Sequence, residues 1–196
     1  MEKKETNLLD CYVLTPDLYG DDRGYFSPYY KEEELKELGF EGVAQANRSK
    51  SSKGVVRGLH FQEDPYCQAK IVEVINGAAI DVVVDLRKDS ETYGKWTSVL
   101  LKPYNENDKE SGKQLFVPRG FAHGFISLED NTIFHYLVDN KYAPKSENGI
   151  LWDDREIGIP WDKWFEEYGI DEPKLSEKDK VRKPLSKTLV KFRRNK

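Results

Sequence analysis

The amino-acid sequence predicts an all-β protein whose strands form one jelly-roll barrel with a few short helices. Short runs of β-branched and aromatic residues follow one another through most of residues 53–139 and are separated by turn residues. The chain has 196 residues, 38% of them hydrophobic, and shows neither an internal repeat nor a linker. Residues 1–196 are therefore expected to form a single domain. Many short strands in a domain of this size favour a closed or double-sheet antiparallel fold.

The first elements follow from short local patterns. Residues 11–20, "CYVLTPDLYG", predict a strand that runs into a turn of Pro, Gly and Asp. Residues 31–40, "KEEELKELGF", predict one short helix, because Leu35 and Leu38 share a face and Gly39 is a typical C-terminal stop.

Residues 53–62, "KGVVRGLHFQ", predict a strand of unusual composition. Arg57 and His60 stand three positions apart among apolar residues and glycines. On a regular strand these two side chains point to opposite faces. One pocket receives both only if the glycines bend the strand out of simple alternation.

The clearest local signal lies in residues 69–88, "AKIVEVINGAAIDVVVDLRK". Two β-rich runs flank the dipeptide Asn76-Gly77, which is typical of a type I′ hairpin. The polar residues 105–112, "NENDKESG", are expected to form a hairpin loop. Beyond residue 161 the chain is expected to turn to short helices and extended segments. Four further strands are expected at residues 97–102, 113–118, 120–128 and 131–139.

The charge is distributed unevenly along the chain. Residues 180–196 form a basic C-terminal tail with eight Lys or Arg and no acidic residue, although the whole chain has a net charge of -4. A basic tail can bind nucleic acid. This tail has a single aromatic residue, Phe192, and so lacks a run of interleaved aromatic residues, and the acidic body would repel a phosphate backbone. We therefore expect no nucleic-acid partner, and a tail that is solvated or packed on the body as a helix.

The sequence also bears on the cellular compartment. No stretch approaches the roughly 20 apolar residues that a membrane span requires, so no membrane partner is expected. The N-terminal residues "MEKKETNLLD" lack the apolar region of a signal peptide. The two cysteines, Cys11 and Cys67, form no disulfide framework and suit a reducing compartment. We expect a cytoplasmic protein.

The three histidines of the chain have different surroundings. His60 in "RGLH" and His123 in "PRGFAHGF" lie among glycines and arginines and are candidates for a functional role. His135 lies between two aromatic residues and is interpreted as a hydrogen-bonded core residue. Metal sites of jelly rolls usually have a second histidine two positions from the first, but Gly58 and Gln62 occupy these positions beside His60. His60 and His123 alone are too few for a three-ligand site unless carboxylates complete it, so we predict no metal.

Five segments of the sequence, in order, resemble one enzyme family. "DDRGYF", "QANRSKSSKGVVRGLHFQ", "QAKIVEVINGAAIDVVVDLRKDSETYGKW", "QLFVPRGFAHGF" and "LSEKD" are similar to the dTDP-4-dehydrorhamnose 3,5-epimerases and their nucleotide-sugar relatives. The resemblance runs from about Leu14 to Asp179. It implies a cupin-type jelly roll, a homodimer, no cofactor, and epimerisation at carbon 3, carbon 5 or both in a nucleotide-linked 4-keto-6-deoxy sugar. The residues leave open a single-carbon epimerase or isomerase of another nucleotide sugar, a metal-using cupin enzyme, and a nucleotide-sugar-binding protein without turnover.

The chemistry of this reaction assigns a role to each catalytic candidate. A hydrogen next to the keto group is weakly acidic, so inversion requires a base, an acid on the opposite face, and a group that stabilises the enolate oxygen. The resemblance implies that His60 is the base, that Asp179 supports it and that Tyr136 is the acid. It also places Lys70 beside the keto oxygen. A buried lysine requires a partner, and Asp81, expected on the paired strand, is the candidate.

The resemblance further implies a set of substrate-binding residues. They supply cations for the diphosphate, aromatic rings for the base, and polar groups that line the nucleotide and sugar site. These residues are Tyr19, Arg23, Phe26, Gln45, Asn47, Arg57, His123, Tyr142 and Lys178.

The sequence departs from the family pattern in three places. Pro28 in "YFSPYY" occupies a position where thymidine-specific members tend to have a glutamate, and Leu137 follows Tyr136 where a lysine is frequent. The segment at residues 105–112 is several residues longer than the usual connection. Because a proline side chain cannot form a hydrogen bond with the base, the sequence leaves the identity of the nucleotide base open.

Overall fold

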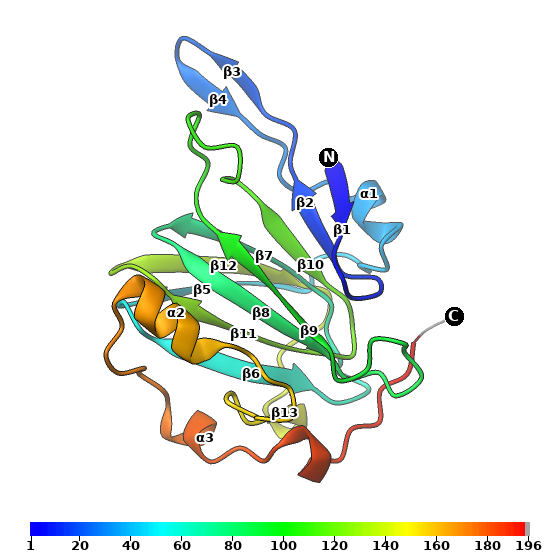
Figure 1. The fold of residues 1–196 in the computed structure, drawn as a ribbon. Helices are drawn as coiled ribbons and strands as arrows, with labels where there is room; N and C mark the ends of the chain where they lie inside the picture. Colours follow the sequence, from blue (N-terminus) through cyan, green and yellow to red (C-terminus); the bar gives the residue numbers. More distant parts are fainter. Residues whose placement is uncertain (195–196) are drawn as a thin grey trace.

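The computed structural model describes residues 1–194, which form two antiparallel β-sheets packed face to face (Figure 1). The six-stranded sheet contains, in spatial order, β1 (Glu2–Glu5), β2 (Tyr12–Thr15), β10 (Gln114–Val117), β7 (Lys70–Asn76), β12 (Thr132–Val138) and β5 (Gln45–Ser51). The five-stranded sheet contains β13 (Glu147–Gly149), β6 (Val56–Gln62), β11 (Phe121–Ser127), β8 (Ala79–Asp85) and β9 (Trp96–Leu101). The predicted jelly roll is confirmed.

Short elements complete the fold around the two sheets. The strands β3 (Tyr19–Asp21) and β4 (Gly24–Phe26) form a separate hairpin that projects beyond the barrel (Figure 1). The helical elements are α1 (Glu32–Lys36), η1 (Pro144–Ser146), α2 (Trp161–Tyr168), α3 (Glu177–Lys180) and η2 (Leu185–Lys187). The helix expected within residues 31–40 is therefore present as α1. Within residues 1–194, no helix is long and apolar enough to cross a membrane.

Apolar side chains hold the sheets and helices together in three buried clusters. Between the sheets, Val83 packs with Phe125 and Phe134, whose rings stack with centroids 4.1 Å apart. On the outer face of the five-stranded sheet, α2 contributes Trp164 to a second cluster. On the outer face of the six-stranded sheet, α1 contributes Leu35 to a third. Both faces of β8, an inner strand of the five-stranded sheet, are thus covered, and every residue of this strand is buried.

The chain passes repeatedly from one sheet to the other, and this overturns the two predicted hairpins. β7 pairs with β10 and β12, whereas β8 pairs with β9 and β11, so Asn76-Gly77 does not join paired strands. Gly77 has a φ of +76°, and a Cβ there would lie 2.6 Å from Thr132 Oγ1. The glycine therefore allows a tight passage between the sheets. Residues 105–112 likewise connect β9 to β10 of the opposite sheet.

The C-terminal tail packs along the barrel as an extended segment. Val190 and Phe192 are buried, and the backbone N–H of Lys88 donates a hydrogen bond to the Phe192 carbonyl. The tail is therefore neither fully solvated nor, beyond η2, a packed helix, which were the two expected alternatives. The last part of the predicted tail, residues 195–196, lies outside the described residues.

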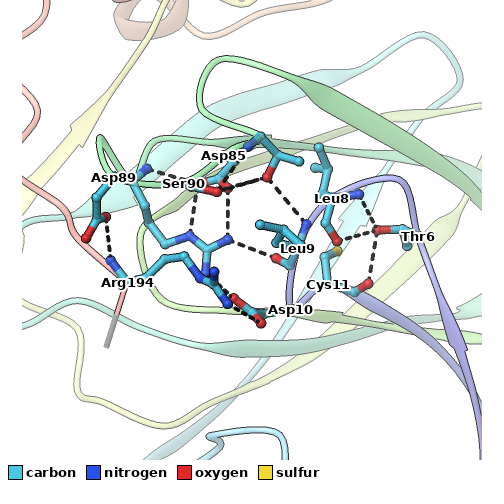
Figure 2. A network of polar contacts seen from close by, with 11 residues as sticks. Thr6, Leu8, Leu9, Asp10, Cys11, Asp85, Asp89, Ser90 and Arg194 are labelled. Carbon is cyan, nitrogen blue, oxygen red and sulfur yellow. Dashed lines mark hydrogen bonds and ion pairs between the residues drawn. The ribbon is translucent and has the colours of Figure 1, made fainter. Parts of the chain in front are cut away.

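A buried network of charges anchors this tail (Figure 2). The Arg87 guanidinium, 4% exposed, donates to Asp85 at 2.9 and 2.8 Å and to Asp10 at 2.7 Å. Arg194 donates to the same Asp10 carboxylate at 3.0 and 3.1 Å. The network therefore joins the loop after β1, the end of β8 and the C-terminal tail.

Candidate active site

Two glycines bring β6 and β11 unusually close together. A Cβ at Gly58 would lie 2.6 Å from the Gly124 Cα, and a Cβ at Gly124 would lie 2.5 Å from the Arg57 carbonyl oxygen. His60 is opposite His123, whereas Arg57 is opposite Phe125, so β6 has one residue more than β11 over this stretch. Such a bulge breaks the alternation of side chains. Arg57 and His60 therefore line the same cavity, as expected if the glycines bend the strand.

Two adjoining cavities meet at three of the candidate catalytic residues. The larger has a volume of about 470 Å³ and the smaller about 330 Å³. Both are lined by His60, Lys70 and Tyr136. Among the other predicted site residues, the larger cavity is lined by Arg57, His123 and Asp179, and the smaller by Gln45, Asn47 and Tyr142.

His60 and Asp179 form a hydrogen-bonded dyad. His60 Nε2 lies 2.5 Å from Asp179 Oδ1, although the residues are 119 positions apart. Asp179 is held on α3, where the Ser176 hydroxyl caps the helix by accepting a hydrogen bond from the Asp179 N–H. Burial opposes ionisation of Asp179, but hydrogen bonds, with His60 first among them, keep its pKa below the usual value. The carboxylate can therefore orient the imidazole and stabilise it when protonated.

Beside this dyad, the partly buried Lys70 accompanies the buried pair Asp81 and His123. Burial lowers the pKa of Lys70 and raises the pKa of Asp81. Asp81 Oδ1 lies 2.7 Å from His123 Nε2, and its Oδ2 has no hydrogen-bond partner within residues 1–194. The expectation that Asp81 lies on the strand paired with Lys70 is wrong, because β7 and β8 belong to different sheets. The two charges instead attract each other across the barrel interior.

Tyr136 lies on β12, in the sheet that faces the His60 strand. Burial raises the pKa of its phenol, which therefore stays protonated at neutral pH. The preceding residue, His135, points away from both cavities and pairs through Nδ1 with Glu73 Oε1 at 2.8 Å. This contact agrees with the interpretation of His135 as a hydrogen-bonded structural residue. Among residues 1–194, no group of three or more His, Cys, Asp and Glu side chains is arranged to hold a metal.

Glu147 is a residue of the smaller cavity that the sequence did not indicate. Its carboxylate accepts a hydrogen bond of 2.6 Å from the Tyr142 hydroxyl and forms an ion pair with Lys178. Lys178, a predicted binding residue, lines neither cavity and reaches the site through this contact. Glu147 lies in a short polar stretch, "KSENG", that resembles an ordinary surface turn. Only its proximity to Tyr142 in the sequence could have indicated it.

Besides Lys178, three predicted binding residues lie outside both cavities. Tyr19, Arg23 and Phe26 belong to the projecting β3–β4 hairpin, and the two aromatic residues are 61% and 68% exposed. Arg23 forms an ion pair with Asp21 of the same hairpin at 2.5 Å. The fold of a single chain therefore does not bring these three residues to the candidate catalytic group.

Comparison with known proteins identifies the family. The sequence model of dTDP-4-dehydrorhamnose 3,5-epimerase matches residues 5–187. The enzyme of that name from Methanothermobacter thermautotrophicus is 42% identical over 187 residues, covering 95% of both chains. A crystal structure of the Bacillus anthracis enzyme with TDP and PPi bound is 41% identical, covers 93% of this chain and 98% of its own, and has a TM-score of 0.81.

A second solved structure is similar over the whole chain. It is dTDP-6-deoxy-D-glucose-3,5-epimerase from Legionella pneumophila in complex with dTDP-4-keto-L-rhamnose. It is 33% identical, covers 100% of this chain and 99% of its own, and has a TM-score of 0.85. The chain therefore belongs to the dTDP-4-dehydrorhamnose 3,5-epimerase family.

Proposed function

We propose that the protein is an isomerase that inverts carbon 3 and carbon 5 of a dTDP-linked 4-keto-6-deoxy sugar. The observation that carries the proposal is the convergence of the His60–Asp179 dyad, Lys70 and Tyr136 where the two cavities meet. These side chains supply the base, the cation and the acid that inversion next to a carbonyl requires. The Legionella pneumophila relative, solved with dTDP-4-keto-L-rhamnose, supports the substrate class.

The positions of the residues suggest how the steps are divided. His60, oriented by Asp179, removes the hydrogen next to the keto group, and the electron pair moves to the oxygen. The Lys70 ammonium stabilises the resulting enolate. Tyr136 then donates a proton to the same carbon from the other face of the ring. His60 and Tyr136 come from opposing sheets, which suits removal and return on opposite faces. These steps require no metal and no redox cofactor.

The exposed hairpin supports a homodimer in which each site is completed by a second copy. In this arrangement the β3–β4 hairpin of one protomer reaches the cavity of its partner. Arg23 then binds the diphosphate, and Tyr19 and Phe26 stack on the base. The exposure of both aromatic rings in the single chain favours this role, because an apolar surface of this kind marks an interaction site. The free, buried Cys11 and Cys67 suit the reducing cytoplasm as the place of action.

Isotope exchange tests the reaction. The protein is incubated with the dTDP-linked 4-keto-6-deoxy sugar in deuterated water, and NMR follows exchange and inversion at carbons 3 and 5. His60→Ala should lower both rates by about 10²–10⁴-fold. Tyr136→Phe keeps the base but removes the acid, so exchange should outpace inversion. If the rates of exchange and inversion fall by the same factor in Tyr136→Phe, Tyr136 is not the acid. Near-normal exchange in His60→Ala would contradict the proposal. The GDP-, CDP- and UDP-linked sugars, run in parallel, test which nucleotide base the enzyme accepts.

Mixing two inactive variants tests the shared site. His60→Ala retains a normal hairpin, and Arg23→Ala combined with Phe26→Ala retains a normal dyad. If the hairpin acts on the partner, each mixed dimer has one complete site, and statistical exchange restores about a quarter of the normal activity. If the hairpin acts within its own chain, the mixed dimers have no complete site and activity does not return. Size measurement of the unmixed protein checks the dimer itself.

A further inference from the structure

The β3–β4 hairpin belongs to neither barrel sheet, so other contacts must set its position. A two-stranded hairpin alone is marginally stable in water. Tyr19 lies opposite Phe26, and Gly20 lies opposite Tyr25. Opposed residues share a face and successive residues alternate. Tyr19 and Phe26 therefore occupy one face of the hairpin, and Tyr25 occupies the other.

The face with Tyr25 contacts the segment of residues 102–113, which connects β9 to β10. The rings of Tyr25 and Tyr104 meet edge to face, with centroids 4.9 Å apart and an angle of 64°. Gly112 has a φ of +68°, and a Cβ there would lie only 3.2 Å from the Tyr104 Cβ. This glycine therefore lets the segment close against the Tyr104 side chain. A cleft of about 380 Å³ beside the contact is lined by both the hairpin and the segment.

The segment is braced by its own polar groups. The buried Ser111 hydroxyl donates to the Asp108 carbonyl at 2.6 Å, lies 3.0 Å from the Asn105 carbonyl, and accepts from the Asn105 N–H at 2.8 Å. Lys102 forms an ion pair with Asp108 across the base of the segment. These contacts fix the backbone of the segment that carries Tyr104, and with it the position of the Tyr104 ring against the hairpin.

We infer that residues 102–113 act as a positioning element for substrate binding. Tyr104 holds Tyr25, so that the opposite face of the hairpin presents Tyr19 and Phe26 to the nucleotide in the partner's cavity. The inference rests on the proposed dimeric site, in which the hairpin contacts substrate. It assigns a role to the polar segment that connects β9 to β10. Tyr104 is a positioning residue and takes no part in proton transfer.

Steady-state kinetics and hydrogen exchange of Tyr104→Ala test the inference. An aromatic pair is strong enough to shift a local equilibrium by about two- to tenfold. KM should rise by this factor while kcat stays unchanged, because Tyr104 supports binding and not the chemical step. The amides of residues 19–26 should exchange faster by a similar factor, with those of β8 as the unchanged reference. Tyr104→Phe retains the ring and should match wild type. Tyr93→Ala is the control, because Tyr93 is 40% and Tyr104 38% exposed.

Phe26→Ala separates failure of this inference from failure of the proposed site. If both Phe26→Ala and Tyr104→Ala raise KM, the inference is supported. If Phe26→Ala raises KM but Tyr104→Ala changes neither KM nor exchange in the hairpin, the inference is wrong and the proposed site stands. If Phe26→Ala leaves KM unchanged, the hairpin does not contact the nucleotide, and the proposed shared site and the positioning role both fall.

Discussion

Lys70 should control the alkaline side of the pH profile. Burial lowers its pKa, and the nearby Asp81 charge only partly opposes this effect. An ammonium stabilises an enolate only while it is protonated. Turnover should therefore be retained below this lowered pKa and fall as the pH rises through it, earlier than for a lysine in water. The pKa of the Tyr136 phenol is raised above its usual value by burial, so this group keeps its proton to higher pH than an ordinary tyrosine.

Lys70→Arg provides the matched measurement for this prediction. A guanidinium stays protonated throughout the accessible range, so the early alkaline fall in kcat should disappear. The maximal rate should decrease, because the larger group does not place its charge where the ammonium was. The measurement is kcat against pH with a saturating nucleotide sugar. An alkaline limb at the same pH in both proteins would show that Lys70 does not cause it.

Residue types and motif spacing predicted much of the site but not its contacts. His60 is recognisable from its glycine- and arginine-rich motif, whereas the roles of Lys70, Tyr136 and Asp179 came from the family resemblance. The structure brings His60, Lys70 and Tyr136 together. Asp179 is the hardest of them to find from local sequence, because it lies 119 positions from His60. Glu147 was missed for a related physical reason. Its importance comes from three-dimensional proximity to Lys178, which no local pattern encodes.

At the scale of elements, the close approach of β6 and β11 should be intolerant of any side chain. Gly124 has no positive φ, yet an added Cβ would lie 2.5 Å from the Arg57 carbonyl oxygen. Gly124→Ala must therefore push the strands apart, at a cost of about 1–3 kcal/mol in unfolding free energy. The same shift should move Arg57 and His60 and reduce kcat.

Denaturant unfolding and kcat of Gly124→Ala check this prediction. Gly20→Ala is the control, because its added Cβ would only touch the Gly24 carbonyl oxygen at 3.7 Å, an ordinary contact. The control should retain stability. If Gly124→Ala were as stable as Gly20→Ala and as active as wild type, the close approach would not shape the site.

Individual strands were easier to predict than their pairing. The expected strands around residues 70–138 are present, because β-branched and aromatic residues suit a pleated, half-buried surface. Asn76-Gly77 was assigned to a hairpin and instead carries the chain between the sheets. A turn dipeptide specifies local dihedral angles, whereas pairing depends on strands that are distant in the sequence. The β3–β4 hairpin was missed because Tyr19–Phe26 is too short to show a clear alternation.

For the whole molecule, the network around Arg87 should contribute strongly to stability. Asp85 is fully buried, so removal of its cation leaves an uncompensated charge in the interior. Arg87→Met should therefore lower the unfolding free energy by about 3–5 kcal/mol. Arg194→Gln should cost less, because this side chain is 38% exposed and Asp10 retains its ion pair with Arg87.

Chemical denaturation of wild type, Arg87→Met and Arg194→Gln measures this order of stability. Lys36→Met is the matched control, since Lys36 pairs with Glu32 at 2.6 Å on the surface of α1. An exposed pair of this kind contributes little, so the control should unfold like wild type. Unfolding of Arg87→Met at the same denaturant concentration as Lys36→Met would contradict the prediction.

The passage of the chain between the sheets has a consequence for synthesis on the ribosome. Neither sheet is formed by a continuous stretch of sequence, because β5 and β12 are neighbours in one sheet while β6 and β11 are neighbours in the other. A nascent chain that ends before β11 cannot close the barrel, and loop closure over such distances slows folding. His60 emerges early, but its partner Asp179 lies on the last α-helix. Catalytic competence should therefore appear abruptly after release of the finished polypeptide, and nascent chains truncated before α3 should remain inactive.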